Sequence, residues 1–246
     1  MNILDGVCWA LVPARGGSKS IPLKNVAPFG GRALIDYGIL AALAATRISR
    51  VLCSTDAPEI ATRCDELGVE VHARPDELGG DATPVMDVIA HFAHDMAARE
   101  GGVAEMIALV QPTSPFLLPQ HLDQAIEALA ADPQAASAQT VITCPHNHHA
   151  FNQRSVRDGN TEFVFAAERQ AAYNKQTKPK HYLFGNIVVM RTALALEQGA
   201  VFAVPSKAVE IPEIFGFDAD GPEDFRLGEL MLEGGLVALD HLEAEK

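Results

Sequence analysis

Near its start the chain reads Val7-Cys8-Trp9-Ala10-Leu11-Val12-Pro13-Ala14-Arg15-Gly16-Gly17-Ser18-Lys19 and continues Ser20-Ile21-Pro22-Leu23-Lys24-Asn25. The first part is an apolar run of strand length, and strands buried on both faces of a parallel sheet have this composition. Two consecutive glycines follow, which let the backbone turn tightly and approach a ligand without a Cβ in the way. Ligands of open α/β sheets bind beside such loops. The stretch therefore predicts an α/β fold with a ligand-binding first loop.

This loop concentrates positive charge in an acidic chain. Residues 14–35 hold four basic side chains and no acidic one, whereas the whole chain has a net charge of −13. Consecutive backbone N–H groups in such a turn can form an anion-binding nest. The basic residues, which are Arg15, Lys19, Lys24 and Arg32, make a triphosphate a suitable ligand. The loop matches neither the Walker A pattern nor G-x-G-x-x-G, and the alternative is an ordinary surface loop with solvated basic residues.

The composition is that of a globular protein. The 246 residues are 48% hydrophobic and 21% charged, which fits one large domain or one domain plus an insertion. A net charge of −13 disfavours non-specific binding to nucleic acid or anionic lipid. We therefore expect no nucleic-acid partner. We also expect no membrane partner, since no apolar run reaches the roughly 18 residues of a membrane span and no signal-peptide pattern is visible. Four cysteines without a C-x-x-C pair predict a reducing, cytoplasmic location.

Short apolar runs alternate with amphipathic runs over the first 135 residues, which predicts a parallel sheet with right-handed helical crossovers. The expected strands are 7–12, 51–54, 69–72 and 106–110, and the expected helices are 33–45, 58–67, 85–99 and 122–131. Beyond residue 134 we expect strands at 138–144, 187–190 and 215–217 and a final helix that begins at Pro222.

Residues 145–181 interrupt this alternation and are polar and aromatic without a clear period. Residues 151–181 contain six basic and three acidic side chains, a local charge of +3, and the segment is interpreted as an insertion on the α/β body. Its basic run around Lys175 either meets an anionic substrate or is a solvated loop. The cluster His146-Asn147-His148-His149 lacks a second set of ligands at suitable spacing, which favours a loop or wall over a transition-metal site.

Two polar motifs follow later strands. In Gln111-Pro112-Thr113-Ser114-Pro115, the Gln111 amide can contact a base edge or a sugar hydroxyl, and the alternative is a turn and cap. In Asp218-Ala219-Asp220, an extended backbone would place both carboxylates on one side, where Mg²⁺ could bind. The alternative is N-capping of the final helix. The chain has no nucleophile–base signature such as G-x-S-x-G or H-E-x-x-H.

Together these motifs resemble those of the acylneuraminate cytidylyltransferases, the CMP-sialic acid synthetases. Five stretches match in order and cover nearly the whole chain: Ala14 to Asn25, Ser54-Thr55-Asp56, Arg74-Pro75-Asp76-Glu77-Leu78 with Asp81, Gln111 to Pro115, and Phe217-Asp218-Ala219-Asp220 with Pro222-Glu223-Asp224. The resemblance implies an α/β fold with a Rossmann-like, mostly parallel sheet of the nucleotide-diphospho-sugar transferase type. It implies a single cytidylyltransferase domain over 1–246, with 145–185 as an inserted segment for dimerisation and sugar binding.

The resemblance also implies the chemistry. CMP would be transferred from CTP to the anomeric hydroxyl of an acidic nine-carbon α-keto sugar, with Mg²⁺ as cofactor and a homodimer as the working state. The catalytic residues would be Arg15, Lys24 and Lys175. The substrate-binding residues would be Ala14, Gly16, Lys19, Asn25, Arg74, Thr83, Gln111, His148 and Asn186, and the metal ligands would be Asp218 and Asp220. The inserted segment would lend residues to the partner's site.

The sequence departs from the family pattern in the insertion. Many members carry N-R-Q-x-x-P-x-x-Y-x-x-N-G, whereas this chain has Lys175 in place of the arginine and Gly185-Asn186 in reversed order. A lysine cannot make the bidentate fork of an arginine, so the acceptor stays open among sialate, legionaminate, pseudaminate and rarer sugars. Two alternatives remain: an octulosonate (KDO) cytidylyltransferase, whose P-A-R loop usually lacks R-G-G-S-K, and a non-catalytic sugar- or nucleotide-binding relative.

Overall fold

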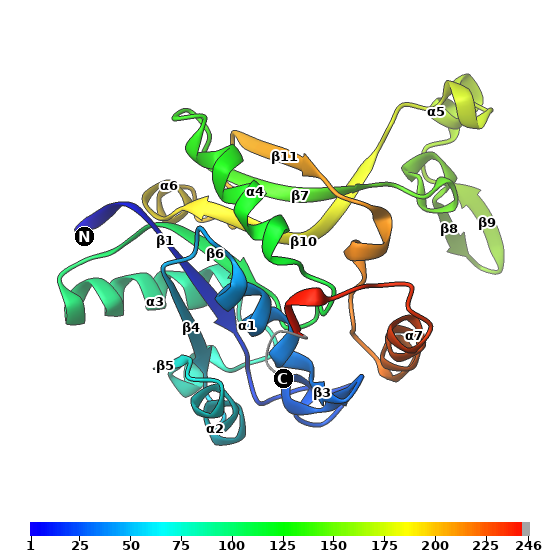
Figure 1. Cartoon of the computed structure of the whole chain (residues 1–246). Helices are drawn as coiled ribbons and strands as arrows, with labels where there is room; N and C mark the ends of the chain where they lie inside the picture. The colour runs from blue at the N-terminus through cyan, green and yellow to red at the C-terminus, as the bar shows by residue number, and fades with distance from the viewer. Residues whose placement is uncertain (243–246) are drawn as a thin grey trace.

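A seven-stranded sheet forms the centre of the computed structural model, which describes residues 1–242 (Figure 1). The strand order is β11-β7-β10-β6-β1-β4-β5. The strands span Ile3–Pro13 (β1), Arg50–Thr55 (β4), Glu70–Ala73 (β5), Val103–Val110 (β6), Ser137–Thr143 (β7), Tyr182–Arg191 (β10) and Ser206–Glu210 (β11). Within this sheet β10 runs antiparallel to both of its neighbours, and the other pairs are parallel. The prediction of an α/β fold with a mostly parallel sheet is confirmed.

Helices cover both faces of the sheet because each central strand is apolar on both sides. In β1, Ala10 and Val12 pack with α1 (Leu34–Ala44), α2 (Pro58–Glu66) and α4 (Pro119–Ala130). Trp9 and Leu11 point to the other face, where α3 (Val85–Glu100) and α6 (Thr192–Gln198) lie. The expected helices of the first 135 residues are thus confirmed. Among residues 1–242 no helix is long and apolar enough to cross a membrane.

A third apolar cluster joins the start and the end of the chain. It surrounds Phe29, whose backbone belongs to the short β2–β3 hairpin (Pro28–Phe29 and Arg32–Ala33). Phe225 of α7 (Pro222–Glu233) meets the Phe29 ring edge to face at 5.3 Å. Gly228 lets α7 approach, because a Cβ there would lie 2.5 Å from the Phe29 ring. This packing brings the segment before α7 close to the loop that follows β1.

The expected last strand at 215–217 is wrong. A 3₁₀ helix, η6 (Glu213–Gly216), occupies this stretch, and the last strand is β11. The aromatic residues that suggested a strand are apolar for another reason: Phe215 packs on His121 and Phe217 stacks on Phe116. The strand β11 escaped detection because its Ser-Lys-Ala-Val-Glu sequence is that of an exposed edge strand.

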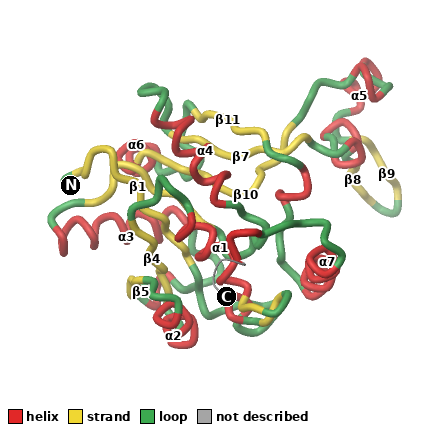
Figure 2. Tube along the Cα trace, viewed as in Figure 1, coloured by secondary structure: helices red, strands yellow, loops and turns green. Residues whose placement is uncertain are grey.

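Residues 144–181, here called the arm, leave β7 and return in β10 after an excursion away from the body, as Figures 1 and 2 show. The arm contains the exposed hairpin β8–β9 (Arg154–Arg157 and Asn160–Phe163), a short helix α5 (Ala166–Ala171) and three 3₁₀ turns, η3 (His146–His148), η4 (Ala150–Asn152) and η5 (Lys175–Thr177). Its base is held by His149, which stacks on His181 with ring centroids 4.0 Å apart. The segment that the sequence predicts to be an insertion therefore projects from the α/β body.

The first prediction concerns a buried ion pair that joins α1 to α2. The carboxylate of Asp36 is fully buried and accepts hydrogen bonds from the Arg63 guanidinium at 2.6 and 2.8 Å. Arg63→Ala leaves this carboxylate without its cation and should lower the free energy of unfolding by about 3 kcal/mol. The matched control is Arg47→Ala, which breaks the exposed Arg47–Glu127 pair and should cost less than about 1 kcal/mol. Equal losses in urea unfolding would contradict the argument.

Candidate functional site

The ends of four parallel strands meet at one edge of the sheet and open into a cleft of about 670 Å³. The loop after β1 forms one wall, and residues that follow β5 and β6 complete it. Of the residues predicted from the sequence, those that line the cleft are Arg15, Lys19, Lys24, Asn25, Arg74, Thr83, Gln111 and Asp220. The structure therefore brings together eight of the predicted site residues, although Arg15 and Asp220 are 205 positions apart in the chain.

Hydrogen bonds hold the backbone of the loop after β1 in place. The N–H of Gly16 donates to Asp56 Oδ1 at 2.9 Å, and Asn25 Nδ2 donates to the carbonyl of Arg15 at 2.9 Å. Ala14 is buried, and its N–H donates to the carbonyl of Ser54 at 3.0 Å. A Cβ at Gly16 would lie 2.7 Å from the Cβ of Ala57, so the loop can lie this close to α2 only with glycine there.

Each cation of the loop is paired with a carboxylate. Arg15 and Lys19 both contact Asp81, the lysine at 2.7 Å. Lys19 and Arg15 hold the pKa of the Asp81 carboxyl below its usual value. Lys24 Nζ lies 3.0 Å from Asp220 Oδ1, and its side chain is only 13% exposed. A polyanionic ligand would replace these carboxylates as the partner of three converging cations, which is the electrostatic condition for binding phosphates.

Arg74 is a buried cation beside the same cleft. Its Nη2 donates to the carbonyl of Ser54 at 2.7 Å, and its Nε lies 3.4 Å from Ser54 Oγ. Burial lowers the pKa of Arg74, and the nearby Asp56 carboxylate offsets part of this effect. Neutral oxygens thus hold one edge of the guanidinium, which leaves its charge available to a ligand in the cleft.

The two candidate metal ligands flank Ala219, and Asp220 lines the cleft. The peptide N–H of Ala219 donates to the carbonyl of Thr113 at 2.8 Å, which ties the segment to the loop after β6. Burial of its carboxyl group, and secondarily the neighbouring Asp220 carboxylate, raise the pKa of Asp218, an effect that a contact with Thr113 opposes. Lys24 partners Asp220, and a divalent ion in contact with both carboxylates would further relieve the repulsion between them.

The N-cap alternative for these aspartates is excluded by the start of α7. Gly221 is the N-cap residue of α7, and Asp224 of the first turn accepts the N–H of Gly221 at 2.8 Å and of Asp220 at 3.1 Å. Within residues 1–242 no group of three or more His, Cys, Asp or Glu side chains is arranged to hold a metal. An ion at Asp218 and Asp220 would therefore need oxygens from a phosphate, as Mg²⁺ typically does.

Six predicted site residues do not line the cleft: Ala14, Gly16 and Asp218 belong to segments that contribute other residues to its lining, and three lie elsewhere. His148 and Lys175 belong to the arm. Asn186 is buried in β10, where its amide nitrogen lies 2.9 Å from His121 Nδ1 and donates to the Phe215 carbonyl at 3.1 Å, while its oxygen accepts from Thr140 at 3.0 Å. Its polar atoms are used to hold strands together, so the geometry of this chain gives Asn186 a structural role.

The reversed Gly185-Asn186 order has a packing cause. The pairing of β10 with β7 shifts register between Phe184 and Val188. A Cβ at Gly185 would lie 2.6 Å from Thr140 Oγ1, so only glycine fits at this irregularity. The next residue then points into the polar network just described.

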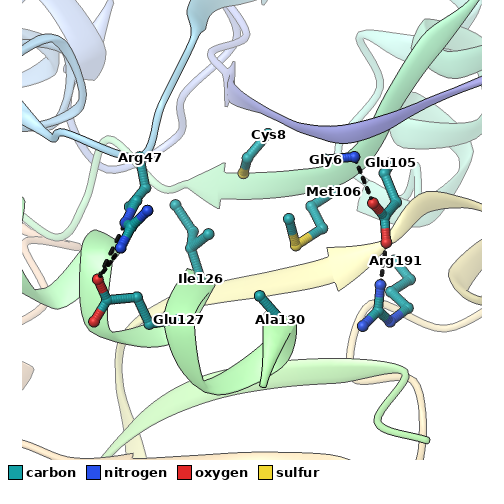
Figure 3. Close-up of a pocket in the computed structure, with 9 residues that line it drawn as sticks. All are labelled: Gly6, Cys8, Arg47, Glu105, Met106, Ile126, Glu127, Ala130 and Arg191. Atoms are coloured by element: carbon teal, nitrogen blue, oxygen red, sulfur yellow. Dashed lines mark hydrogen bonds and ion pairs between the residues drawn. The ribbon is translucent and has the colours of Figure 1, made fainter. Parts of the chain in front are cut away.

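A second cavity of about 440 Å³ lies at the opposite edge of the sheet, and Figure 3 shows its lining. Cys8, Met106 and Ile126 supply apolar surface. Two ion pairs border it, Arg47 with Glu127 at 2.8 Å and Arg191 with Glu105. Each of these two cations is in direct contact with its own carboxylate, and the lining between the two pairs is apolar. Such a lining suits a polyanion less well than that of the first cleft, where two cations share Asp81.

Asp56 belongs to the Ser54-Thr55-Asp56 stretch, yet the sequence motifs assign it no role in the site. Its carboxylate accepts the N–H of Gly16 and lies near Arg74. A signal was present, since Asp56 follows a strand that is adjacent to the first strand of a parallel sheet. Side chains at adjacent strand ends contact the same loops.

The fold and the cleft together define an α/β protein with a basic cleft at the carboxyl edge of its sheet, a lining that suits a phosphorylated ligand. A family model described as "Cytidylyltransferase" matches residues 9–198. The chain belongs to the cytidylyltransferase family, which confirms the family resemblance.

Two named relatives and one solved structure are similar to this chain. N-acylneuraminate cytidylyltransferase A of Danio rerio is 39% identical over 120 residues, which are 49% of this chain and 27% of that protein. CMP-N,N'-diacetyllegionaminic acid synthase of Legionella pneumophila is 27% identical over 94% of this chain and 98% of that protein. The solved structure of a CMP:2-keto-3-deoxy-manno-octonic acid synthetase with CTP is 15% identical, covers 93% of this chain and 99% of that chain, and superposes with a TM-score of 0.69. At this identity the structural likeness shows the fold alone, and the chain spans a third or less of the first vertebrate relatives.

The second prediction uses the two glycines of the loop as a matched pair. Gly16→Ala forces the loop off α2 and should weaken binding of tripolyphosphate about ten-fold, because the cations no longer converge. A Cβ at Gly17 would meet no atom of residues 1–242 within 4 Å, so Gly17→Ala should leave the loop in position and should bind tripolyphosphate more tightly than Gly16→Ala does. Calorimetric titration measures both variants, and equal affinities would contradict the role given to the loop.

Proposed function

We propose that the protein transfers CMP from CTP to the anomeric hydroxyl of a nine-carbon, sialic-acid-like α-keto acid and releases pyrophosphate. The observation that carries the proposal is the cleft, in which Arg15, Lys19 and Lys24 converge on a cavity at the carboxyl edge of the sheet. The relatives support the acceptor class, because one is named for N-acylneuraminate and another for N,N'-diacetyllegionaminic acid.

The reaction needs positioning and charge neutralisation more than covalent chemistry. The anomeric oxygen attacks the α-phosphorus in line, an oxygen–phosphorus bond forms, and the bond to the bridging oxygen of the pyrophosphate breaks. The hydroxyl proton is released to solvent, and pyrophosphate leaves with the electron pair of the broken bond. Arg15, Lys19 and Lys24 would bind the phosphates, and the amide of Gln111 and the guanidinium of Arg74 would contact the nucleotide. These five side chains line one cleft.

We also propose Mg²⁺ as the cofactor, held by Asp218 and Asp220. The raised pKa of Asp218, due to burial and to Asp220, supports a site that gains from a divalent cation. Bound Mg²⁺ would neutralise phosphate charge during the transfer. Asp220 would exchange Lys24 for this ion and free the lysine for the nucleotide.

A homodimer and a cytoplasmic location complete the proposal. The arm exposes Val156, Val164 and Tyr173, whose exposed fractions are 69%, 55% and 71%, and such a surface suits an interface. In a dimer the arm of one protomer would carry His148 and Lys175 to the cleft of its partner. The four cysteines are free thiols, which supports a reducing compartment.

The third prediction tests the activity itself. With CTP and a panel of sugars that includes N-acetylneuraminate, legionaminate, pseudaminate and octulosonate, pyrophosphate release should occur with a nine-carbon acid and should be much slower with UTP. Arg15→Ala should lower the rate roughly 10²-fold or more. Turnover of octulosonate alone would establish the eight-carbon alternative, and CTP binding without release would indicate a non-catalytic relative.

The fourth prediction separates metal binding from helix capping. Asp218→Asn and Asp220→Asn should each lower pyrophosphate release by roughly 10²-fold or more with the thermal midpoint nearly unchanged. Asp224→Ala is the comparison variant, because it removes the carboxylate that accepts the N–H groups of Gly221 and Asp220. It should cost about 1 kcal/mol of stability and should lower pyrophosphate release much less than the two metal-ligand variants do. Loss of stability rather than rate in the first two variants would reject the metal role.

The fifth prediction tests whether the arm crosses between protomers. Arg15→Ala and Lys175→Ala should each be nearly inactive. When the two variants are unfolded together and refolded, half of the dimers are mixed, and each mixed dimer has one site with both native residues. Activity should therefore return to about a quarter of the unaltered level. No recovery, or full activity in a monomer at micromolar concentration, would refute the crossing arm.

A further inference from the structure

A buried polar chain runs from the surface of α3 to the guanidinium of Arg74. His72 of β5 is 1% exposed, and its Nε2 lies 3.0 Å from Asp95 Oδ2 of α3. Its Nδ1 lies 3.4 Å from Ser54 Oγ of β4. The same Ser54 oxygen is 3.4 Å from Arg74 Nε. None of the groups before Arg74 lines the cleft.

Strand geometry explains the chain. Ser54 and His72 are paired in the parallel register of β4 and β5, so their side chains leave the sheet on the same side. Arg74 follows His72 by two positions and points to that side as well. Two adjacent strands thus place a histidine, a hydroxyl and a guanidinium in one row.

The direction of each hydrogen bond is fixed by its end groups. An ionised Asp95 only accepts, so Nε2 of His72 carries a proton and donates to it. Burial lowers the pKa of His72, so Nδ1 keeps a lone pair. That lone pair accepts the Ser54 hydroxyl proton, and an oxygen lone pair of Ser54 then faces the Arg74 Nε–H. Arg99 pairs with Asp95 at 3.1 Å and keeps that carboxylate ionised.

We propose that His72, oriented by Asp95, is a positioning residue that sets the Ser54 hydroxyl and thereby aims the Arg74 guanidinium into the nucleotide cleft. The inference rests on the proposed function in that CTP is the ligand of the cleft. If the Ser54 hydroxyl turned its proton toward Arg74, two donors would face each other. The guanidinium would then lose one of the two contacts that hold it.

Two substitutions of His72 distinguish the proposal from a purely structural role. His72→Gln keeps an N–H toward Asp95 and offers Ser54 no acceptor, whereas His72→Asn keeps an acceptor near the Nδ1 position and loses Asp95. In calorimetric titrations, His72→Gln and Ser54→Ala should each weaken CTP binding about five-fold, the effect of one hydrogen bond. Ser54→Ala/His72→Gln should bind no more weakly than Ser54→Ala, and His72→Asn should stay within about two-fold of the unaltered protein.

The matched control is His91→Gln, since the His91 ring packs 5.3 Å from His72 and takes no part in the chain of hydrogen bonds described above. It should bind CTP normally. Unchanged binding in His72→Gln, additive losses in the double variant, or equal losses in His72→Asn and His72→Gln would overturn the proposal. If the buried variants do not fold, Asp95→Ala tests it from the surface and should weaken CTP binding about two-fold; unchanged affinity would count against it.

Nitrogen-15 NMR of the ligand-free protein provides a readout that needs no CTP. His72 should show a protonated Nε2 and an unprotonated Nδ1, and Asp95→Ala should produce a mixture of the two tautomers. A proton on Nδ1 in the unaltered protein overturns the proposal whatever the activity. Absence of CTP binding in the unaltered protein, by contrast, refutes the proposed function and leaves the tautomer measurement to decide on the positioning chain.

Discussion

The carboxylate of Asp56 is the contact on which the cleft depends. It accepts the N–H of Gly16 and so anchors the loop after β1 to the end of β4. A Cβ at Gly79 would lie 2.4 Å from the same carboxylate, so the loop after β5 closes on it from the other side. Asp56 also offsets the cost of burying the Arg74 charge. One acidic side chain at a strand end therefore fixes two loops and one cation, and this geometry determines where a phosphate can lie.

Charge balance explains how an acidic chain can bind an acidic ligand. The protein carries a net charge of −13, yet its cleft collects Arg15, Lys19 and Lys24 on one wall. Asp81 and Asp220 partner these cations, and both aspartates are largely exposed, so they can separate from them at little desolvation cost. Binding is then an exchange of partners, in which phosphate oxygens replace carboxylates, and the cations remain ordered before the ligand arrives.

The sequence predicted the parallel body and the basic wall of the cleft, because both follow from local patterns. Strand and helix periods are visible in single stretches, and the charge of residues 14–35 needs no neighbours to be recognised. It failed where tertiary packing decides. Phe215 and Phe217 are apolar because they pack on His121 and Phe116. Asn186 is polar because its amide joins β10 to β7, to α4 and to η6. Neither cause can be seen without the fold.

The two departures from the family pattern in the arm now have different meanings. The order Gly185-Asn186 follows from the irregular pairing of β10 with β7, where a side chain at position 185 would collide with Thr140. It is a consequence of how the arm joins the sheet and requires no change in chemistry. Lys175 has no such explanation, since it is exposed in a 3₁₀ turn of the arm. Lysine there offers a single point charge where an arginine would offer a planar fork, so under the proposed function a difference in acceptor preference would arise in the arm and not in the cleft.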